Sequence, residues 1–456
     1  MLKKRVLALL LALATTGTLV LTGCGGNGGA PAQSGADSKP SSTADDASAP
    51  EASSQEDDAP AADPYPTLEN GDITILWHTT EETHNENMAK NPDTFDAVWS
   101  VKAAFEEKYG GTVTVNAVPW GDMKATLISM VSTGEVCDLA QANDQNFPIY
   151  PSKKLIQPVD TIVDLNDELW YDSVTKAFTF GGEPYAMGTD ATSILIYYNK
   201  TLFENYSEKT PEEYYADGEW NWENFRKAGM AMTDDTTGDG EIDQYGFDWW
   251  GQTYQLFLAS NGLPCILYGD DGSIQGAYDQ PQAVEALQFL QNAYVKDAYV
   301  GKLGNDAFVG NFRSGKLAMT CEYGMLNYAD VDFELGVVPF PAGPNGKQDQ
   351  GLGGLTGWSI PVTAGNTEGA AAFAYMSSKM TKENVQKNNL AKFSEEEVAR
   401  YQRTVENIVF SPIGIDKFWD ANATLFTGLT DGTPVATFAA TAMDMIKEGA
   451  KTTLEQ

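Results

Sequence analysis

The run Ile73-Thr74-Ile75-Leu76-Trp77 decides the fold class, because it opens a regular alternation of strands and helices. Its β-branched and large apolar residues predict a buried strand. Two more strands are predicted over 113–118 and 138–143, after helices that end at Gly110-Gly111 and at Gly134. The apolar residues at helical spacing are Phe95, Val98, Trp99 and Phe105, then Met123, Leu127, Met130 and Val131. This β-α-β-α-β order predicts a parallel sheet covered by helices.

The rest of the chain carries the same mixture of strands and helices. A hairpin is predicted around Gly181-Gly182. Helices are predicted from Trp222, after the cap Asn221, and from Pro281. The predicted apolar face of the second helix consists of Val284, Leu287, Leu290 and Tyr294. Further strands are predicted over 193–199, 318–321, 336–338 and 359–362, and the remainder is mostly helical. Since a body of about 390 residues exceeds the usual size of one core, we expect two α/β lobes.

The N-terminal residues predict export from the cell. The basic head Lys3-Lys4-Arg5 precedes an apolar run over 6–21, which is too short to span a bilayer comfortably. The sequence Leu21-Thr22-Gly23-Cys24 ends this run and resembles a bacterial lipobox, which implies lipid on Cys24. We therefore expect residues 1–23 to be a signal peptide and Cys24 to anchor the protein at the extracellular face of the membrane. The alternative is an ordinary signal peptide with an incidental cysteine.

Composition separates a linker from a folded body. Residues 24–66 are rich in Gly, Ala, Ser, Pro and acidic residues, which predicts the lipidated cysteine followed by a disordered linker. Residues 67–456 should form the body. The formal net charge of −35 excludes nucleic acid as a partner, because phosphate binding needs clustered Lys and Arg. This acidity favours solubility at a cell surface, and a cationic ligand is the alternative interpretation.

The four cysteines indicate neither a disulfide framework nor a metal site. Cys24 is assigned to lipid, so Cys137, Cys265 and Cys321 remain and allow at most one disulfide. None of the three lies in a CxxC motif or a Cys/His cluster. We expect them to be small buried apolar residues.

Several blocks, in order along the chain, resemble one protein family. The first two, at 134–140 and 155–160, are similar to the family's "SGE-x-PDL" and "LLQPLD" segments. The block at 198–203 resembles "YNK-x-LF", and the block at 312–319 resembles "F-x-x-GKAAM". The run from Gly336 to Gly346 is similar to "G-x-x-P-x-P-x-GP". The family is that of the extracellular solute-binding proteins of bacterial ABC importers, carbohydrate-type family 1.

The resemblance implies both a fold and a function. The implied fold is periplasmic-binding-protein-like, of the Venus-flytrap type, with several segments crossing a hinge and a ligand cleft between two lobes. The implied function is capture of a sugar or oligosaccharide and delivery to an ABC transporter permease. Such a receptor works as a monomer and requires no cofactor. A cationic or peptide-like solute is the alternative ligand class.

The residues themselves indicate no catalytic set. His78 and His84 are the only two histidines, and their spacing does not fit HExxH. Neither a GxSxG nor a P-loop motif is present, so we predict that the protein is not an enzyme. A secreted glycosidase that uses two carboxylates, and a surface scaffold without a small-molecule ligand, remain as alternatives.

Aromatic and polar residues at strand ends form the predicted ligand site. Sugars need carboxylates and amides for their hydroxyl groups and flat aromatic faces for their rings. Loops at the carboxyl ends of strands are where ligands bind in open α/β sheets. The candidate residues are Trp77, His78, Asn143, Asp144, Asp190, Trp249, Trp250, Glu322, Tyr323 and Trp358. The alternative for Trp77 and Trp358 is a place in the core, for His78 a structural role, and for Asp144 a helix cap. Trp249 and Trp250 should face opposite ways, with one of them in the core.

Two further segments carry predictions. Residues 79–91 are polar and acidic, and we expect them to form a long loop, either solvated or in contact with the solute. Residues 235–243 resemble the start of an EF-hand, with Gly240 at the turn. The predicted calcium ligands are Asp235, Thr237, Asp239, Glu241 and Asp243. Gly246 occupies the twelfth position, where the bidentate carboxylate is missing, so a plain Asp/Gly turn is the alternative.

Overall fold

A computed structural model describes residues 63–269, 271–302, 307–324 and 331–455. The predicted signal peptide, Cys24 and nearly all of the predicted linker lie outside these described residues. The chain divides into two compact units, of which the larger holds residues 67–84 and 95–456. Among the described residues, the smaller unit holds 63–66 and 85–94. Within the described part, none of the helices combines the length and the apolar character that a membrane crossing needs.

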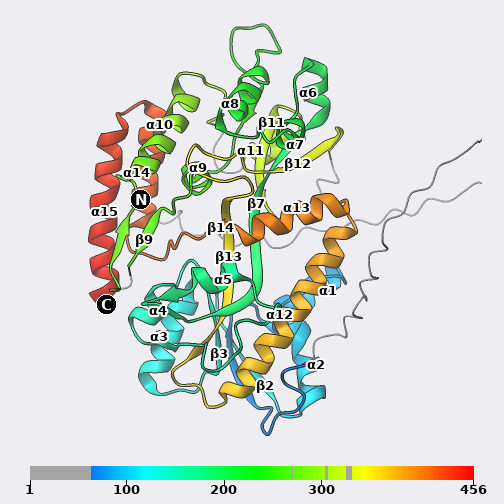
Figure 1. The fold of residues 1–456 in the computed structure, drawn as a ribbon, viewed down its shortest axis with the longest axis vertical. Helices are drawn as coiled ribbons and strands as arrows, with labels where there is room; N and C mark the ends of the chain where they lie inside the picture. The colour runs from blue at the N-terminus through cyan, green and yellow to red at the C-terminus, as the bar shows by residue number, and fades with distance from the viewer. Residues whose placement is uncertain (1–62, 270, 303–306, 325–330, 456) are drawn as a thin grey trace, which may run out of the picture. The chain divides into compact units, whose positions relative to one another are not determined.

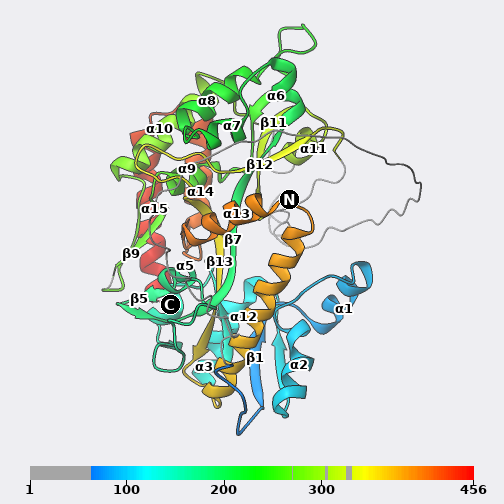
Figure 2. The same cartoon turned by 45° about the vertical axis from the view of Figure 1, so that its right-hand side comes forward.

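The predicted β-α-β-α-β order is confirmed in the first part of the larger unit. The strands β1 (Ile73–Trp77), β2 (Val113–Ala117) and β3 (Leu139–Ala142) are parallel, with β1 between the other two. The helices α2 (Trp99–Tyr109) and α3 (Met123–Thr133) connect them. We call these strands, together with α2, α3 and the long helix α12 (Thr367–Leu390), the N-terminal lobe. Figure 2 shows α12 beside this sheet.

Two long strands join the N-terminal lobe to the rest of the sheet. The strand β13 (Gly351–Pro361) pairs with β3 and with β7 (Met187–Asn199), both antiparallel. In turn, β7 pairs with β11 (Leu317–Tyr323) and β12 (Leu335–Pro339), and β11 pairs with β8 (Tyr245–Phe247). Figure 1 shows β7 and β13 running together from one lobe to the other. We call β8, β11, β12 and the helices around them the C-terminal lobe.

The remaining elements complete the two lobes. The short strands are β4 (Ile156–Gln157), β5 (Thr179–Phe180), β6 (Glu183–Pro184), β9 (Ile266–Tyr268), β10 (Ile274–Gly276) and β14 (Ile408–Val409). The first helical elements are α1 (Glu81–Lys90), η1 (Trp120–Asp122), α4 (Ile149–Ser152), α5 (Asp172–Ala177), α6 (Lys200–Tyr206), α7 (Pro211–Ala216) and α8 (Trp222–Ala231). The later helices are α9 (Thr253–Ser260), α10 (Pro281–Val295), α11 (Ala307–Arg313), α13 (Glu395–Glu406), α14 (Phe418–Asp431) and α15 (Val435–Glu455).

Each lobe has its own apolar core. In the N-terminal lobe, Leu76 of β1 and Ala140 of β3 pack against Leu127 of α3. On the other face of this sheet, the ring of Phe105 in α2 lies 5.2 Å from that of Phe373 in α12. The core of the C-terminal lobe is larger and includes Tyr197, Phe225 and residues of α14 and α15. The expectation of two α/β lobes is therefore confirmed.

The two strands that join the lobes are longer than the sequence predicted. The predicted strand over 193–199 begins at Met187, and the one over 359–362 begins at Gly351. The added part of β13 is rich in glycine, which is a weak strand former. Glycine is needed at Gly353 because a Cβ there would lie 2.6 Å from the carbonyl oxygen of Thr192. The close packing of the two strands thus explains a composition that resembles a loop.

Three local predictions need correction. The segment 79–91, predicted as a loop, contains the helix α1, whose start is fixed by a hydrogen bond from the Thr83 N–H to the Thr80 hydroxyl. No residue of α1 is buried, so the apolar pattern that marks most helices was absent. The helix α2 begins at Trp99 rather than before it, because the Asp96 carboxylate accepts the N–H groups of Val98 and Trp99. Val284, placed on the apolar face of α10, is 40% exposed.

Other local predictions are confirmed. The side chain of Asn221 accepts the N–H of Asn224 and caps α8. The hairpin around Gly181-Gly182 is formed by β5 and β6. Cys137, Cys265 and Cys321 are free and buried. Burial raises the pKa of both Cys137 and Cys265 to about 12, so these thiols stay protonated at neutral pH.

Candidate functional site

One cluster joins predicted site residues from both lobes. Asp144 follows β3, and its backbone carbonyl accepts the N–H groups of Ile413 and Gly414 at 2.8 and 3.1 Å. These bonds connect the end of a strand in the N-terminal lobe to the segment that leads into α14. On the other side, Tyr323 at the end of β11 lies close enough for the Asp144 and Glu322 charges to act on it. Burial first, and these charges second, hold the pKa of Tyr323 well above its ordinary value.

The aromatic part of this cluster comes from the residues that follow β8. The rings of Trp249 and Trp250 are stacked, with centroids 5.3 Å apart and planes inclined by 20°. Each lies 6.5 Å from the ring of Tyr323. The prediction that the two indoles face opposite ways is wrong, because they stack on each other. The prediction that one belongs to the core is confirmed, since Trp249 is 3% exposed and Trp250 is only partly buried.

Carboxylates near the lobe junction are surrounded by protein and still reach water. Asp144 is half-buried, and burial raises the pKa of its carboxyl from 3.8 to about 6. Asp190 in β7 is exposed, yet protein encloses it densely enough that burial raises its pKa to about 6 as well. Tyr323 is 38% exposed under similar enclosure. These three side chains are therefore close to other protein groups and still accessible to water, so a ligand at the lobe junction could reach them.

Trp77 and Trp358 form a separate pair inside the N-terminal lobe. Their rings are stacked at 5.2 Å, and Trp358 also meets Phe373 edge to face at 6.3 Å. The Trp77 indole N–H donates to the Asp96 carboxylate at 3.1 Å. Trp77 and Trp358 are 4% and 6% exposed. These values support the core interpretation of both indoles, and we do not propose a sugar on Trp358.

A small cavity lies between this pair and Asp190. Its volume is about 10 Å³, and Thr189 and Thr381 are among the other residues that line it. A space of this size holds about one water molecule. Asp190 therefore lies at the border between the aromatic pair and the surface, and it does not share this cavity with Asp144.

The remaining predicted residues have mainly local roles. The Asn143 side chain is buried, and its oxygen accepts the N–H of Gln145. His78 lies against Trp77 and meets Trp120 edge to face at 4.8 Å. Burial lowers the pKa of His78 and outweighs the negative charge of Asp96, which acts in the opposite direction. This imidazole is therefore neutral at pH 7. Glu322 is 7% exposed and lies beside Tyr323 in the sequence.

The sequence alone did not identify the segment Pro412-Ile413-Gly414, which contacts the residues after β3 in this cluster. A Cβ at Gly414 would lie 1.7 Å from the carbonyl oxygen of Gln145, so only glycine allows the segment to approach Asp144. Its local sequence, Pro412-Ile413-Gly414, gives a weak signal for such an approach. Asp144, which this segment contacts, lies far away in the sequence.

The predicted calcium segment is folded as a hydrogen-bonded turn. The Asp235 carboxylate accepts the N–H groups of Gly238 and Gly240, each at 2.7 Å. The Asp243 carboxylate accepts from Thr236. Across the described residues, no group of three or more His, Cys, Asp or Glu side chains is placed to hold a metal ion. These hydrogen bonds favour the alternative interpretation of the segment as an Asp/Gly turn.

We expect millimolar calcium to leave this protein unchanged. The twelfth loop position is Gly246, where a Cβ would lie 2.1 Å from the carbonyl oxygen of Gly229, so no carboxylate fits there. Calorimetry on chelator-treated protein should show no heat of calcium binding, and the melting temperature should not rise. A measurable heat that disappears in Asp235→Ala would establish the calcium site instead.

Comparison with known proteins identifies the family. The family described as bacterial extracellular solute-binding protein matches residues 86–381, which is more than half of the 456-residue chain. A binding protein of Brucella abortus is 25% identical over 264 residues, which cover 54% of this chain and 60% of the relative. An ABC transporter-binding protein of Deinococcus radiodurans is 23% identical over 316 residues, which cover 64% of this chain and 71% of the relative. This chain thus spans about 60% of the length of the Brucella relative.

Solved structures share the fold. An extracellular solute-binding protein of Staphylococcus aureus in complex with maltose matches with a TM-score of 0.64 at 15% identity, covering 84% of this chain and 99% of that chain. An ABC substrate-binding protein of Listeria monocytogenes in complex with cycloalternan matches with a TM-score of 0.59 at 16% identity, covering 83% and 99%. These likenesses show the two-lobed fold. The family match shows that the chain belongs to the bacterial extracellular solute-binding proteins.

Proposed function

We propose that this protein captures a sugar or oligosaccharide outside the cell and delivers it to an ABC transporter permease. The observation that supports this most is the cluster at the lobe junction, where carboxylates meet aromatic faces. Asp144 and Glu322 would accept hydrogen bonds from sugar hydroxyl groups, and Trp250 would stack on a ring. The sugar ligands of similarly folded proteins, maltose and cycloalternan, support the same class.

The proposed organisation has three parts. Residues 1–23 are the signal peptide, 24–66 carry the lipid and a flexible linker, and 67–456 form the binding body. The protein works as a monomer at the extracellular face of the membrane, needs no cofactor and catalyses no reaction. A chromogenic glycoside that stays intact with purified protein supports this proposal, and its hydrolysis would favour the glycosidase alternative.

A thermal-shift screen tests the ligand class. Maltotriose and other neutral oligosaccharides should raise the melting temperature, because a ligand that binds only the folded state stabilises it. A cationic or peptide-like solute is the second candidate, since Asp144, Asp190 and Glu322 place carboxylates near the lobe junction. Stabilisation by polyamines or short peptides without any effect of oligosaccharides would favour that candidate.

Binding should depend on pH through Asp144. Since burial raises the pKa of Asp144 to about 6, the folded protein takes up a proton at this group as the pH falls through about 6, before the unfolded chain does. The contribution of Asp144 to stability therefore rises as the pH falls from about 7 to about 4, and it is lost again as the pH rises. A protonated carboxyl accepts fewer hydrogen bonds, so affinity for maltotriose should fall over the same range.

The measurement compares the wild type with Asp144→Asn. Urea unfolding and calorimetric titration at about pH 7 and about pH 5 give four values for each protein, and the difference between proteins isolates Asp144. From about pH 7 to about pH 5, the wild type should gain stability and lose affinity for maltotriose relative to the variant. Equal pH dependence in both proteins would contradict the role of Asp144.

Cys24→Ala should release the protein from the membrane. Without the thiol, no diacylglycerol can attach, and the body lacks another anchor in this proposal. Fractionation should move the protein from the membrane pellet to the soluble fraction, or leave it as an uncleaved precursor. Ser48→Ala in the linker is a suitable control and should stay in the pellet. A variant that remains as membrane-bound and as lipid-labelled as the wild type would refute the assignment.

A further inference from the structure

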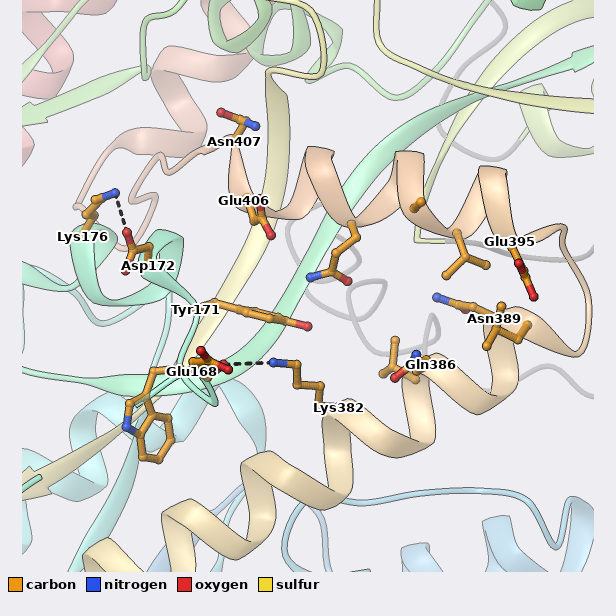
Figure 3. Close-up of a pocket in the computed structure, with 16 residues that line it drawn as sticks. Glu168, Tyr171, Asp172, Lys176, Lys382, Gln386, Asn389, Glu395, Glu406 and Asn407 are labelled. Carbon is orange, nitrogen blue, oxygen red and sulfur yellow. Dashed lines mark hydrogen bonds and ion pairs between the residues drawn. The ribbon is translucent and has the colours of Figure 1, made fainter. Parts of the chain in front are cut away.

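A second concave site lies between α12 and α13, away from the cluster at the lobe junction. Its cavity has a volume of about 910 Å³, which lies within the range of small-molecule sites. The last turns of α12, the inner side of α13 and the segment from Glu168 to Lys176 line it. None of the predicted ligand residues is among its lining residues. We call this cavity the α12–α13 groove, and Figure 3 shows it with Tyr171 between the two helices.

Contacts with the C-terminal lobe fix the upper wall of the groove. Arg400 of α13 is 6% exposed, donates to the carbonyl of Val337 in β12 and pairs with Glu212 of α7 at 3.4 Å. One turn later, Arg403 pairs with Asp349 at 3.1 Å. Tyr401 of the same helix is 5% exposed and belongs to the core of the C-terminal lobe. These contacts hold α13 in place, so the groove exists before any ligand enters.

The lower wall is equally well anchored. Trp170 is 7% exposed, meets Tyr375 of α12 edge to face at 5.8 Å, and donates its indole N–H to the carbonyl of Asp164. The Lys382 ammonium lies 5.2 Å from the ring centroid of Tyr171 and donates to the carbonyl of Glu168 at 3.2 Å. Figure 3 shows this lysine between α12 and the Tyr171 ring. The lysine is therefore committed to local contacts.

The groove presents hydrogen-bonding groups of both kinds beside apolar surface. Carboxamides of Gln386 and Asn389 line the groove from α12, and that of Gln402 lines it from α13. Carboxamides both donate and accept, as hydroxyl groups do. Val385 and Leu390 are 42% and 44% exposed and line the same space. Apolar side chains of this kind suit the C–H face of a sugar ring.

The charges that line the groove are mixed, with more acids than lysines, and they disfavour strongly ionic ligands. The two lysines are occupied, since Lys176 pairs with Asp172 at 3.0 Å and Lys382 contacts Tyr171 and Glu168. Glu395 and Glu406 add negative charge at the rim, which disfavours a phosphate. Lys176 and Lys382 add two positive charges to the lining, which weakens its attraction for a polyamine. A neutral ligand with many hydroxyl groups fits this set best.

We propose that the α12–α13 groove is a second binding site, for a neutral polyhydroxylated ligand such as the end of an oligosaccharide. Gln386, Asn389 and Gln402 hold its hydroxyl groups. Its carbon face lies on Val385 and Leu390. The site is separate from the cluster of Asp144, Trp250 and Tyr323 and acts independently of the proposed function.

Indole resonances in NMR spectra can report on the two sites separately. In the mature protein labelled with ¹⁵N at tryptophan, Trp170 reports on the groove and Trp250 on the lobe junction, with assignment by Trp170→Phe and Trp250→Phe. Maltotriose, raffinose and myo-inositol are the neutral probes, and spermidine and glucose 6-phosphate are their charged counterparts. We expect at least one neutral probe at millimolar concentration to shift the Trp170 resonance. The same shift should occur in the Trp250→Ala variant, because the groove is separate from the lobe junction.

Matched variants test the residues of the groove. Gln386→Ala and Gln402→Ala should each weaken the effect on Trp170 roughly tenfold, whereas Asn388→Ala, an amide on α12 outside the groove, should not. All three lie on the surface of helices, and an unchanged melting temperature confirms their folding. The proposal is wrong if no neutral probe moves Trp170, if the glutamine variants behave like the wild type, or if the charged probes shift Trp170 more. A silent Trp250 resonance would count against the proposed function instead.

Discussion

Trp358→Ala should lower the free energy of unfolding by about 3–5 kcal/mol, the range measured for truncation of large buried aromatic residues. The indole is 6% exposed and stacks on Trp77, and its edge meets Phe373. Alanine would leave a cavity between β13 and α12 that neighbouring strands cannot fill without moving. Since native proteins are stable by only about 5–15 kcal/mol, this is a large part of the total. Urea unfolding, with linear extrapolation to water, measures the change.

The matched control is Trp358→Phe, which keeps most of the stack. It should cost less than half of the alanine effect, because the ring still contacts Trp77 and Phe373. Both variants should retain affinity for ligand at temperatures where they are folded. An alanine variant as stable as the wild type that has lost its ligand would instead restore the prediction that Trp358 holds a sugar.

The strand that carries Trp358 shows where sequence patterns fail. The strand predicted over 359–362 begins after Trp358, yet β13 already runs through Gly353, Gly354 and Trp358 itself. Only the close packing of β13 against β7 explains the composition, and packing of this kind is a tertiary property. The first strands were predictable for the opposite reason. Local residues alone account for Ile73–Trp77, whose apolar side chains are almost fully buried.

The candidate site was predictable in part. Strand ends pointed to Asp144 and Tyr323, and the structure brings both to the junction of the lobes. The sequence could not show that Ile413 and Gly414 meet Asp144 from a position about 270 residues later, because such contacts depend on the path of the whole chain. Nor could it find the α12–α13 groove, whose polar residues are ordinary on helix surfaces and become a site only where two helices face each other.

Replacement of Trp250 or Asp144 should have the largest effect on binding. Trp250 stacks on Trp249, meets Phe308 edge to face at 6.0 Å and is only partly buried, whereas Trp249 belongs to the core. Trp250 is therefore the indole of this pair that a sugar ring could reach. A stacked indole contributes on the order of 1–2 kcal/mol, and a hydrogen bond to a charged group about 1.5–3 kcal/mol. Trp250→Ala and Asp144→Asn should therefore each weaken maltotriose binding at least about tenfold.

The two effects should combine in a way that reveals the site. If Trp250 and Asp144 hold the same sugar ring, the double variant should lose less than the sum of the single losses, because the residual ligand shifts once either contact is gone. Isothermal titration of the wild type, both single variants and the double variant completes the cycle. Asp160→Asn, at an exposed position, is the matched control and should bind as the wild type does. Wild-type affinity in the double variant would place the ligand elsewhere, because a site that depends on the carboxylate and the indole could not survive the loss of both.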